Sequence, residues 1–254
     1  MIAKSISINW KLFMLLLVAS VASAVAAMPY TFYLYDLSSL ELPVPIPVAV
    51  LATVLQSAIL FGLSILIGLH LGNRTNLGAP LLEAWLNKKP IEKLSSILTL
   101  SCIVGAIIGS LLFALDRYAF GYFIEPVTNF QSTPPLWTRV LVSFYGGIAE
   151  EILMRLFLTT LLVWLFSKFS RSAKSSLHVW AAIIIVSIIF GLSHLPMTAS
   201  FTELTTLVVT RAVVLNGIAG IVFGWLYWRK GLTSAIIAHF VTDITLHVAM
   251  PLVL

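Results

Sequence analysis

Charged residues are scarce in this chain, and cysteine is almost absent. Only 10% of the 254 residues are Asp, Glu, Lys or Arg, whereas soluble domains carry about 25%. Hydrophobic residues make up 59% of the chain and the mean hydropathy is +1.03, so there is too little polar surface to face water. The one cysteine, Cys102, excludes an internal disulfide, and its place in an apolar run predicts a small buried residue.

Long apolar runs dominate the sequence instead. A membrane-spanning helix needs about 20 apolar residues, and seven runs come close enough to this length. They predict an all-α, multi-pass bundle in the cell membrane, with lipid as its surroundings. The predicted spans are Leu12–Ala27, Val48–Leu69, Leu94–Leu115, Val140–Phe166, Leu177–Ser193, Leu204–Trp228 and Leu232–Leu254.

The charges between these runs predict the orientation of the chain. Basic residues gather at the N-terminus and in the second, fourth and sixth connections: Lys4, Lys11, Arg74, Lys88, Lys89, Lys93, Lys168, Arg171, Lys174, Arg229 and Lys230. The other connections hold Asp36, Glu41, Asp116, Glu125 and Glu203, with Arg117 and Arg139. This alternation predicts a cytoplasmic N-terminus. It also explains the formal charge of +5 without a nucleic-acid partner.

Three segments near the N-terminal half carry further expectations. Lys4, Lys11 and the sequence Ala22-Ser23-Ala24 resemble a signal peptide, and its cleavage would leave six spans in the same orientation. The proline-rich segment Leu42–Pro47 is expected to be extended. Pro80–Leu86, beside two lysines, predicts a short interfacial helix.

Polar residues inside the spans are concentrated in the C-terminal half. A charged side chain at the bilayer centre costs about 2.5–3.5 kcal/mol on insertion scales, so such residues are rare and usually functional. The predicted fourth to seventh spans contain Glu150, Glu151, Arg155, His194, Arg211, Asn216, His239, Asp243 and His247. The first three spans contain nothing comparable. We therefore divide the chain into an N-terminal membrane region (1–135) and a core (136–254).

Helix geometry separates the two adjacent glutamates. Glu151 and Arg155 are four residues apart, share a face and can form an ion pair. Glu150 is rotated by about 100° from that face and is left without a cation. A partly desolvated carboxylate without a cation is a candidate general base. An ion-pair network that only stabilises the bundle is the alternative for both glutamates.

The seventh span has a polar stripe. His239, Asp243 and His247 recur every four residues and so lie on one helix face, which should point into the bundle. Asp243 is expected to accept a hydrogen bond from His239 and to fix the tautomer of its ring. His247 lies nearer the helix end and is the weakest member. Arg211 and Asn216 are expected to make structural hydrogen bonds.

Three motifs in this order resemble one known family. Glu150-Glu151-x-x-x-Arg155, Phe190-x-x-x-His194 and His239-x-x-x-Asp243 look like the motifs of the CAAX protease and bacteriocin-processing family, also called CPBP or Abi proteins. The resemblance implies an intramembrane endopeptidase acting on a membrane-embedded or lipidated substrate. It implies that Glu150 activates water with help from His194, and that His239 and Asp243 stabilise the oxyanion. Glu151 and Arg155 would support the helix.

Two departures from the family pattern concern the site itself. Many members continue the first motif as Phe-Arg-Gly, but here Met154 and Leu156 flank Arg155. The last motif ends in Asp243, where other members often have Asn. An amide donates to an oxyanion directly, whereas Asp donates only when protonated. Asp243 is therefore also expected to act by orienting His239.

Several alternatives stay open on the sequence. Glu and His could hold zinc with one position left for water, but no HExxH motif is present, which favours a metal-free mechanism without a cofactor. Buried Glu, His and Asp also serve as relays in ion- or proton-coupled transporters, although no paired repeat is seen. His194 and His239 could bind haem. With the predicted boundaries, these two histidines meet only if the spans tilt or if the fifth span extends beyond Ser193.

Overall fold

The computed structural model describes residues 8–35, 37, 44–91, 94–123, 134–169 and 176–253, and these contain helices but no strands. Seven helical segments are long and apolar enough to cross a membrane. The chain is thus an all-α, multi-pass integral membrane protein, as predicted. The spans run Trp10–Leu34, Ile46–Thr75, Leu94–Phe120, Leu136–Phe169, Ser176–Ala199, Thr206–Lys230 and Leu232–Val253.

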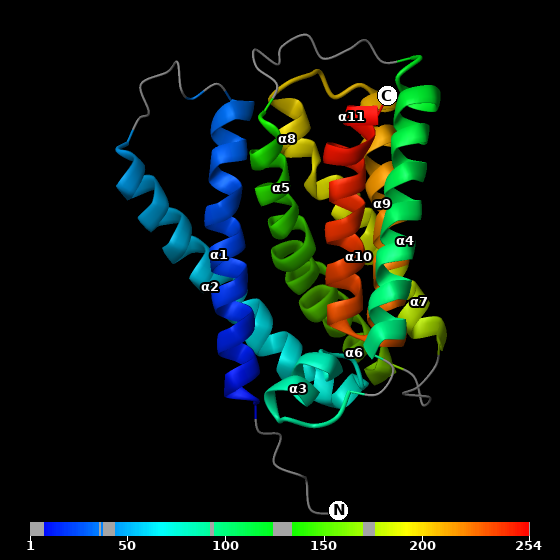
Figure 1. The fold of residues 1–254 in the computed structure, drawn as a ribbon. Helices are drawn as coiled ribbons and strands as arrows, with labels where there is room; N and C mark the ends of the chain where they lie inside the picture. Colours follow the sequence, from blue (N-terminus) through cyan, green and yellow to red (C-terminus); the bar gives the residue numbers. More distant parts are fainter. Residues whose placement is uncertain are drawn as a thin grey trace, which may run out of the picture.

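Several spans are built from more than one helical element (Figure 1). The first two spans are α1 (Trp10–Leu34) and α2 (Ile46–Thr75), and the sixth is α9 (Thr206–Lys230). The third joins α4 (Leu94–Ala114) to the π-helix η1 (Leu115–Phe120). The fourth comprises α5 (Leu136–Phe144), η2 (Tyr145–Glu150), η3 (Ile152–Thr159) and α6 (Thr160–Phe169). The fifth comprises α7 (Ser176–Ser193) and α8 (Leu195–Ala199), and the seventh comprises α10 (Leu232–Ile244), η4 (Thr245–Ala249) and α11 (Met250–Val253).

The observed spans are mostly longer than the predicted ones. The third extends to Phe120, so Asp116 and Arg117 lie in its last turns. The prediction that they lie in a connection is wrong. Figure 1 places the start of α1 and the end of α11 at opposite ends of the bundle. The orientation across the membrane stays a prediction, because many of its charges lie outside the described residues: Lys4, Asp36, Glu41, Lys93, Glu125, Arg171 and Lys174.

The first span is packed into the bundle. Leu12 and Leu16 are buried in the main hydrophobic cluster together with Phe61 and Ile65 of α2. α1 also lies against α5 and η2 of the fourth span. Losing this helix as a cleaved leader would uncover an apolar face of the remaining bundle, so the packing favours a retained first span.

Small residues bring the two halves of the chain together. A side chain on Gly68 of α2 would lie 2.5 Å from the Leu156 carbonyl oxygen, and one on Gly105 of α4 would lie 2.5 Å from that of Ala238 in α10. The hydroxyls of Ser101 and Ser234 are 2.6 Å apart across the α4–α10 contact. The Thr242 hydroxyl donates to the Gly105 carbonyl at 3.0 Å. Close backbone approach at small residues is typical of helix packing in membranes.

The remaining predictions about the fold are partly confirmed. Pro80–Leu86 forms the short helix α3, as expected, and Figure 1 shows α3 at one end of the bundle. Trp85 of this helix is exposed. The expectation that Cys102 is buried is wrong, since its side chain is exposed on α4. Of the extended segment predicted at Leu42–Pro47, the first two residues lie outside the described residues, and α2 begins within it at Ile46.

Arg211 and Asn216 make structural interactions, as predicted. Arg211 in α9 forms a two-pronged ion pair with Asp116 in η1, with Nε 2.5 Å from Oδ1 and Nη2 2.7 Å from Oδ2. This pair links the third span to the sixth. The Asn216 amide donates to the Ala212 carbonyl in its own helix at 2.9 Å.

Candidate functional site

The two glutamates lie where the fourth span is widened into consecutive π-helical turns. Glu150 ends η2, and Glu151 stands between η2 and η3. π-helical turns occur frequently at functional sites. Gly146 and Gly147 lie one turn earlier and let this segment approach α10, because a side chain at Gly147 would lie 3.0 Å from Phe240 Cβ and one at Gly146 would overlap the Asp243 carboxylate.

The predicted ion pair between Glu151 and Arg155 is confirmed. Arg155 Nε lies 3.2 Å from Glu151 Oε2, and both side chains are fully buried. The two atoms are not aligned as a hydrogen bond, so the contact is electrostatic. Arg155 also donates from Nη2 to the Gly220 carbonyl of α9 at 3.3 Å. The guanidinium lies over the rings of Phe190 and Phe223, at 5.2 and 5.6 Å from their centroids, which stabilises a desolvated cation.

Glu151 has a second partner, which spacing within one helix does not predict. Its Oε1 accepts a hydrogen bond from Nδ1 of His239 at 2.8 Å. Because a carboxylate paired with arginine only accepts, Nδ1 carries the proton. The expectation that Asp243 fixes the tautomer of His239 is therefore wrong: Asp243 lies on the opposite side of the ring, and Glu151 holds Nδ1. Arg155, Glu151 and His239 form one chain of interactions through the buried core.

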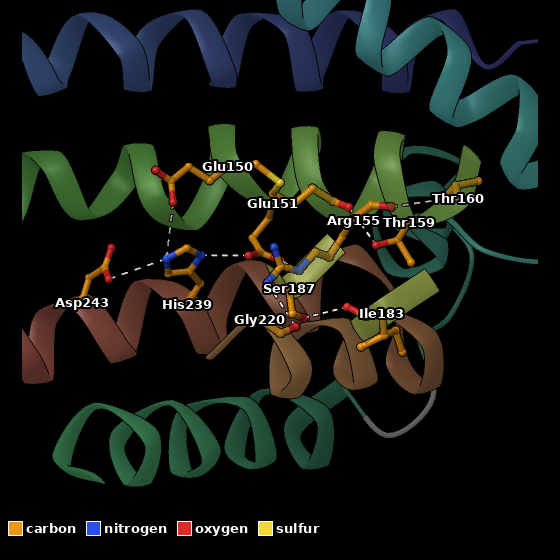
Figure 2. Close-up of polar contacts among 11 residues, drawn as sticks. Glu150, Glu151, Arg155, Thr159, Thr160, Ile183, Ser187, Gly220, His239 and Asp243 are labelled. Atoms are coloured by element: carbon orange, nitrogen blue, oxygen red, sulfur yellow. Dashed lines mark hydrogen bonds and ion pairs between the residues drawn. The ribbon is translucent and has the colours of Figure 1, made fainter. Parts of the chain in front are cut away.

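The other ring nitrogen of His239 faces two carboxylates (Figure 2). Nε2 lies 3.8 Å from Glu150 Oε2 and 3.6 Å from Asp243 Oδ1. Both distances exceed hydrogen-bond length, so Nε2 is committed to neither oxygen. The side chains of Glu150 and Asp243 are 23% and 18% exposed, compared with 0% for Glu151. One carboxylate of the glutamate pair is therefore accessible, and the other is sealed.

Aromatic rings fix the plane of His239. Phe223 of α9 stacks on the imidazole with centroids 4.6 Å apart and planes at 23°. Phe190 of α7 meets the same ring edge-on at 5.8 Å. Four spans thus position this one side chain, since Glu150 and Glu151 come from the fourth, Phe190 from the fifth, Phe223 from the sixth and His239 from the seventh.

His194 lies at the joint between α7 and α8, and among the described residues its contact with the site runs through Phe190. Its Nδ1 is 2.8 Å from the Phe190 carbonyl oxygen; a carbonyl only accepts, so Nδ1 carries a proton, and in the neutral ring Nε2 has the lone pair. The Phe190 ring lies 4.8 Å from the His194 ring and 5.8 Å from that of His239. The fifth span does extend beyond His194, to Ala199. Among the described residues, no hydrogen bond or ion pair joins His194 to Glu150, His239 or Asp243.

His247 does not continue the stripe of His239 and Asp243. The helix widens into η4 at Thr245, which changes the residue spacing, and the His247 side chain is exposed. Its backbone carbonyl accepts a hydrogen bond from Arg139 Nη1 at 3.2 Å. The observed stripe is therefore limited to two residues.

The described part of the chain offers no ready-made metal site, because no group of three or more His, Cys, Asp and Glu side chains is spaced to hold an ion. His194 and His239 are the two candidate haem ligands. Nδ1 of His239 is bonded to Glu151, and the Phe190 ring contacts both histidine rings. No observation supports the transporter alternative.

Comparison with known proteins agrees with the three motifs. Residues 132–245 match the family model described as type II CAAX prenyl endopeptidase Rce1-like. The match covers the fourth, fifth and sixth spans and most of the seventh, with all six of the predicted site residues. No curated protein and no solved structure matches the chain. This segment thus carries a domain of the CAAX endopeptidase family.

Proposed function

With residues 132–245 placed in the CAAX endopeptidase family, we propose that the protein hydrolyses a peptide bond of a lipidated, membrane-associated substrate by glutamate-activated water. The observation that carries this proposal is the position of Glu150. Its accessible carboxylate faces the same histidine nitrogen as Asp243, while the neighbouring Glu151 is buried behind that histidine.

In this mechanism Glu150 is the general base. Water is a poor nucleophile, so a carboxylate must accept one of its protons as its oxygen attacks the carbonyl carbon of the scissile bond. The proton then passes from Glu150 to the leaving amine nitrogen as the C–N bond breaks. In a neutral His194 ring, Nε2 accepts a hydrogen bond from the second O–H of the same water and orients it.

His239 is the proposed donor to the tetrahedral intermediate. With Nδ1 bonded to Glu151, a doubly protonated ring would direct its Nε2–H toward the developing oxyanion. Asp243, close to the same nitrogen, would orient the ring or, when protonated, donate itself. Glu151 and Arg155 act as positioning residues because they hold the ring and do not reach the accessible side.

The central experiment is cleavage of a fluorogenic prenylated CAAX-type peptide by purified protein in liposomes. We expect Glu150→Gln to lower kcat by about 10²–10⁴-fold and His239→Ala to lower it by about 10²–10³-fold. Glu203→Gln removes the same charge from an exposed residue and should leave kcat unchanged. Wild-type rates in both site variants, with intact folding, would exclude this site as the catalytic centre.

Two further arms test the details of the proposal. Activity that survives exhaustive chelation supports the glutamate mechanism, whereas loss on chelation and recovery with zinc supports a metal-bound water. An unprenylated peptide of the same sequence tests substrate choice. Equal cleavage of the two peptides would show that the lipid is not recognised.

Gly146 offers a finer test of the geometry. A Cβ at this position would overlap the Asp243 carboxylate and lie 3.2 Å from His239 Nε2. We expect Gly146→Ala to displace Asp243 and to reduce kcat by about tenfold, the equivalent of 1.4 kcal/mol in the barrier. Gly62→Ala is the control, because the added methyl there meets only Leu17 at 3.9 Å. Equal activity of the two variants would show that the position of Asp243 does not matter.

A further inference from the structure

A polar cavity lies outside the catalytic motifs, at the end of the bundle where α9 turns into α10. It has a volume of about 390 Å³. The end of α2, the start of α3, α4 and the end of α9 all contribute to its wall, which includes Asn76, Gly78, Trp228, Arg229, Lys230 and Gly231. Figure 1 shows α3 and the ends of these helices at the same end of the bundle.

The backbone shapes this cavity at two turns. Asn76 ends α2 in the left-handed conformation (φ 57°), and Gly231 separates α9 from α10 at φ 90°. The Leu232 amide donates to the Gly78 carbonyl at 2.9 Å, which fastens one turn to the other. A side chain on Gly231 would lie 2.5 Å from Pro80 Cδ. The wall is therefore a defined structure and not a loose connection.

The described residues of the cavity wall carry positive charge. Arg229 and Lys230 are exposed, and none of the described residues that line the cavity is acidic. Neither cation forms an ion pair with any residue that the structure describes. Arg229 lies over the Trp228 ring at 5.3 Å from its centroid. Arg229 and Lys230, together with the Asn76 amide in the same wall, favour an anion with several oxygen acceptors.

We propose that this cavity binds the phosphate headgroup of an anionic membrane phospholipid. Basic pockets between membrane helices bind such headgroups. The cavity lies at the end of a membrane span, where Trp228 and the basic pair form the usual interfacial boundary. Its wall also includes the apolar residues Pro80, Leu81 and Ile97, which suit the glycerol and upper acyl region of a lipid better than a free inorganic ion.

Lipid binding to purified protein in detergent, followed by native mass spectrometry, tests this proposal. The probes are phosphatidylglycerol, phosphatidylcholine and inorganic phosphate. Because each basic residue near an anionic membrane surface contributes about 1 kcal/mol, the double variant Arg229→Gln/Lys230→Gln should bind phosphatidylglycerol about 30-fold more weakly than wild type. Phosphatidylcholine and inorganic phosphate should bind wild type more weakly than phosphatidylglycerol.

The chain provides a matched control. Lys88 and Lys89 are also adjacent, exposed and close to α3, but they do not line the cavity. Lys88→Gln/Lys89→Gln removes the same charge and should keep wild-type lipid binding. Equal weakening in both double variants would reduce the effect to general surface charge and overturn the proposal. Equal binding of phosphatidylcholine, or of inorganic phosphate, would overturn the assignment to an anionic lipid.

A charge-conserving variant guards against a folding defect. Arg229→Lys/Lys230→Arg keeps both cations and should bind phosphatidylglycerol within a few-fold of wild type. Thermal melting without added lipid shows whether each variant is folded. If the charge-conserving variant is folded and loses binding as completely as the glutamine variant, charge is not the determinant and the proposal fails.

Discussion

The first three spans and the last four bury polar side chains in different ways. In the first three, most are serines that donate back to their own helix, as Ser20 does to Leu16 and Ser64 to Leu60, both at 2.8 Å. In the last four, Glu151, Arg155 and His239 reach between helices. A hydroxyl bonded within its helix places no constraint on its neighbours. A buried charge needs a partner, and here that partner ties one span to another.

The two regions therefore have different roles in the bundle. The charged network fixes the fourth, sixth and seventh spans relative to one another, because each supplies a group that the others need. Among the described residues, the first three spans bury no charged side chain, and they approach the last four closely at glycine, as at Gly68 and Gly105. They support the outside of the site and leave its chemistry to the C-terminal spans.

Removing the cation from the buried network should have the largest effect. Arg155→Met leaves Glu151 charged and fully buried, and breaking a buried pair in this way costs about 3–5 kcal/mol. We expect a large fall in the thermal melting midpoint of the detergent-solubilised protein. Arg74→Met, at an exposed residue, is the control and should melt like wild type. An unchanged midpoint for Arg155→Met would show that the network does not stabilise the bundle.

Disturbing the packing between the regions should have a smaller effect. Gly105→Ala places a methyl 2.5 Å from the Ala238 carbonyl oxygen and 2.9 Å from Val241 Cβ, so α4 must move away from α10. Overpacking of this kind costs about 1–3 kcal/mol, and peptidase activity should fall as well because α10 carries His239. Gly217→Ala meets nothing within 4 Å and should stabilise the helix slightly. If both variants melt alike, the α4–α10 contact is not tight.

Neutralising Asp116, which lies in the third span and pairs with Arg211 of the sixth, should have the smallest effect. Asp116→Asn weakens the contact with Arg211. The side chains of Asp116 and Arg211 are 35% and 37% exposed. Ion pairs at this exposure contribute about 0–1 kcal/mol. We expect a small decrease in the melting midpoint, which shrinks further in high salt because ions screen exposed pairs. A decrease as large as that of Arg155→Met would erase the difference between the two regions.

Much of the fold follows from the sequence, because lipid imposes a strict length and composition on each span. The seven apolar runs gave all seven spans, with errors at the ends where a charged residue such as Asp116 is tolerated through a partner on another span. Cys102 was misplaced because an apolar run does not tell which side faces lipid and which faces protein.

The motifs predicted residues that lie together in the structure, namely Glu150, Glu151, Arg155, His239 and Asp243, but not all of the contacts among them. Spacing within one helix revealed the pair Glu151–Arg155, since residues four apart share a face. It could not reveal that Glu151 also holds His239, because that contact joins residues 88 positions apart. The same holds for the stacking of Phe223 on His239. The doublet Gly146-Gly147 is the feature of the sequence that indicates a close approach in the fourth span.

The π-helical turns around Glu150 and Glu151 make chain length a determinant of the chemistry. Each such turn accommodates a residue more than an α-helical turn, and the Thr159 and Thr160 hydroxyls accept this wider spacing by donating to Met154 and Arg155, five positions back. Deleting one residue from Ile152–Thr159 would restore ordinary helical spacing. It would also rotate the part of the span before the deletion, which carries Glu150 and Glu151, relative to the part after it. The identity of the carboxylate that meets solvent is thus encoded in the number of residues in this helix as much as in their types.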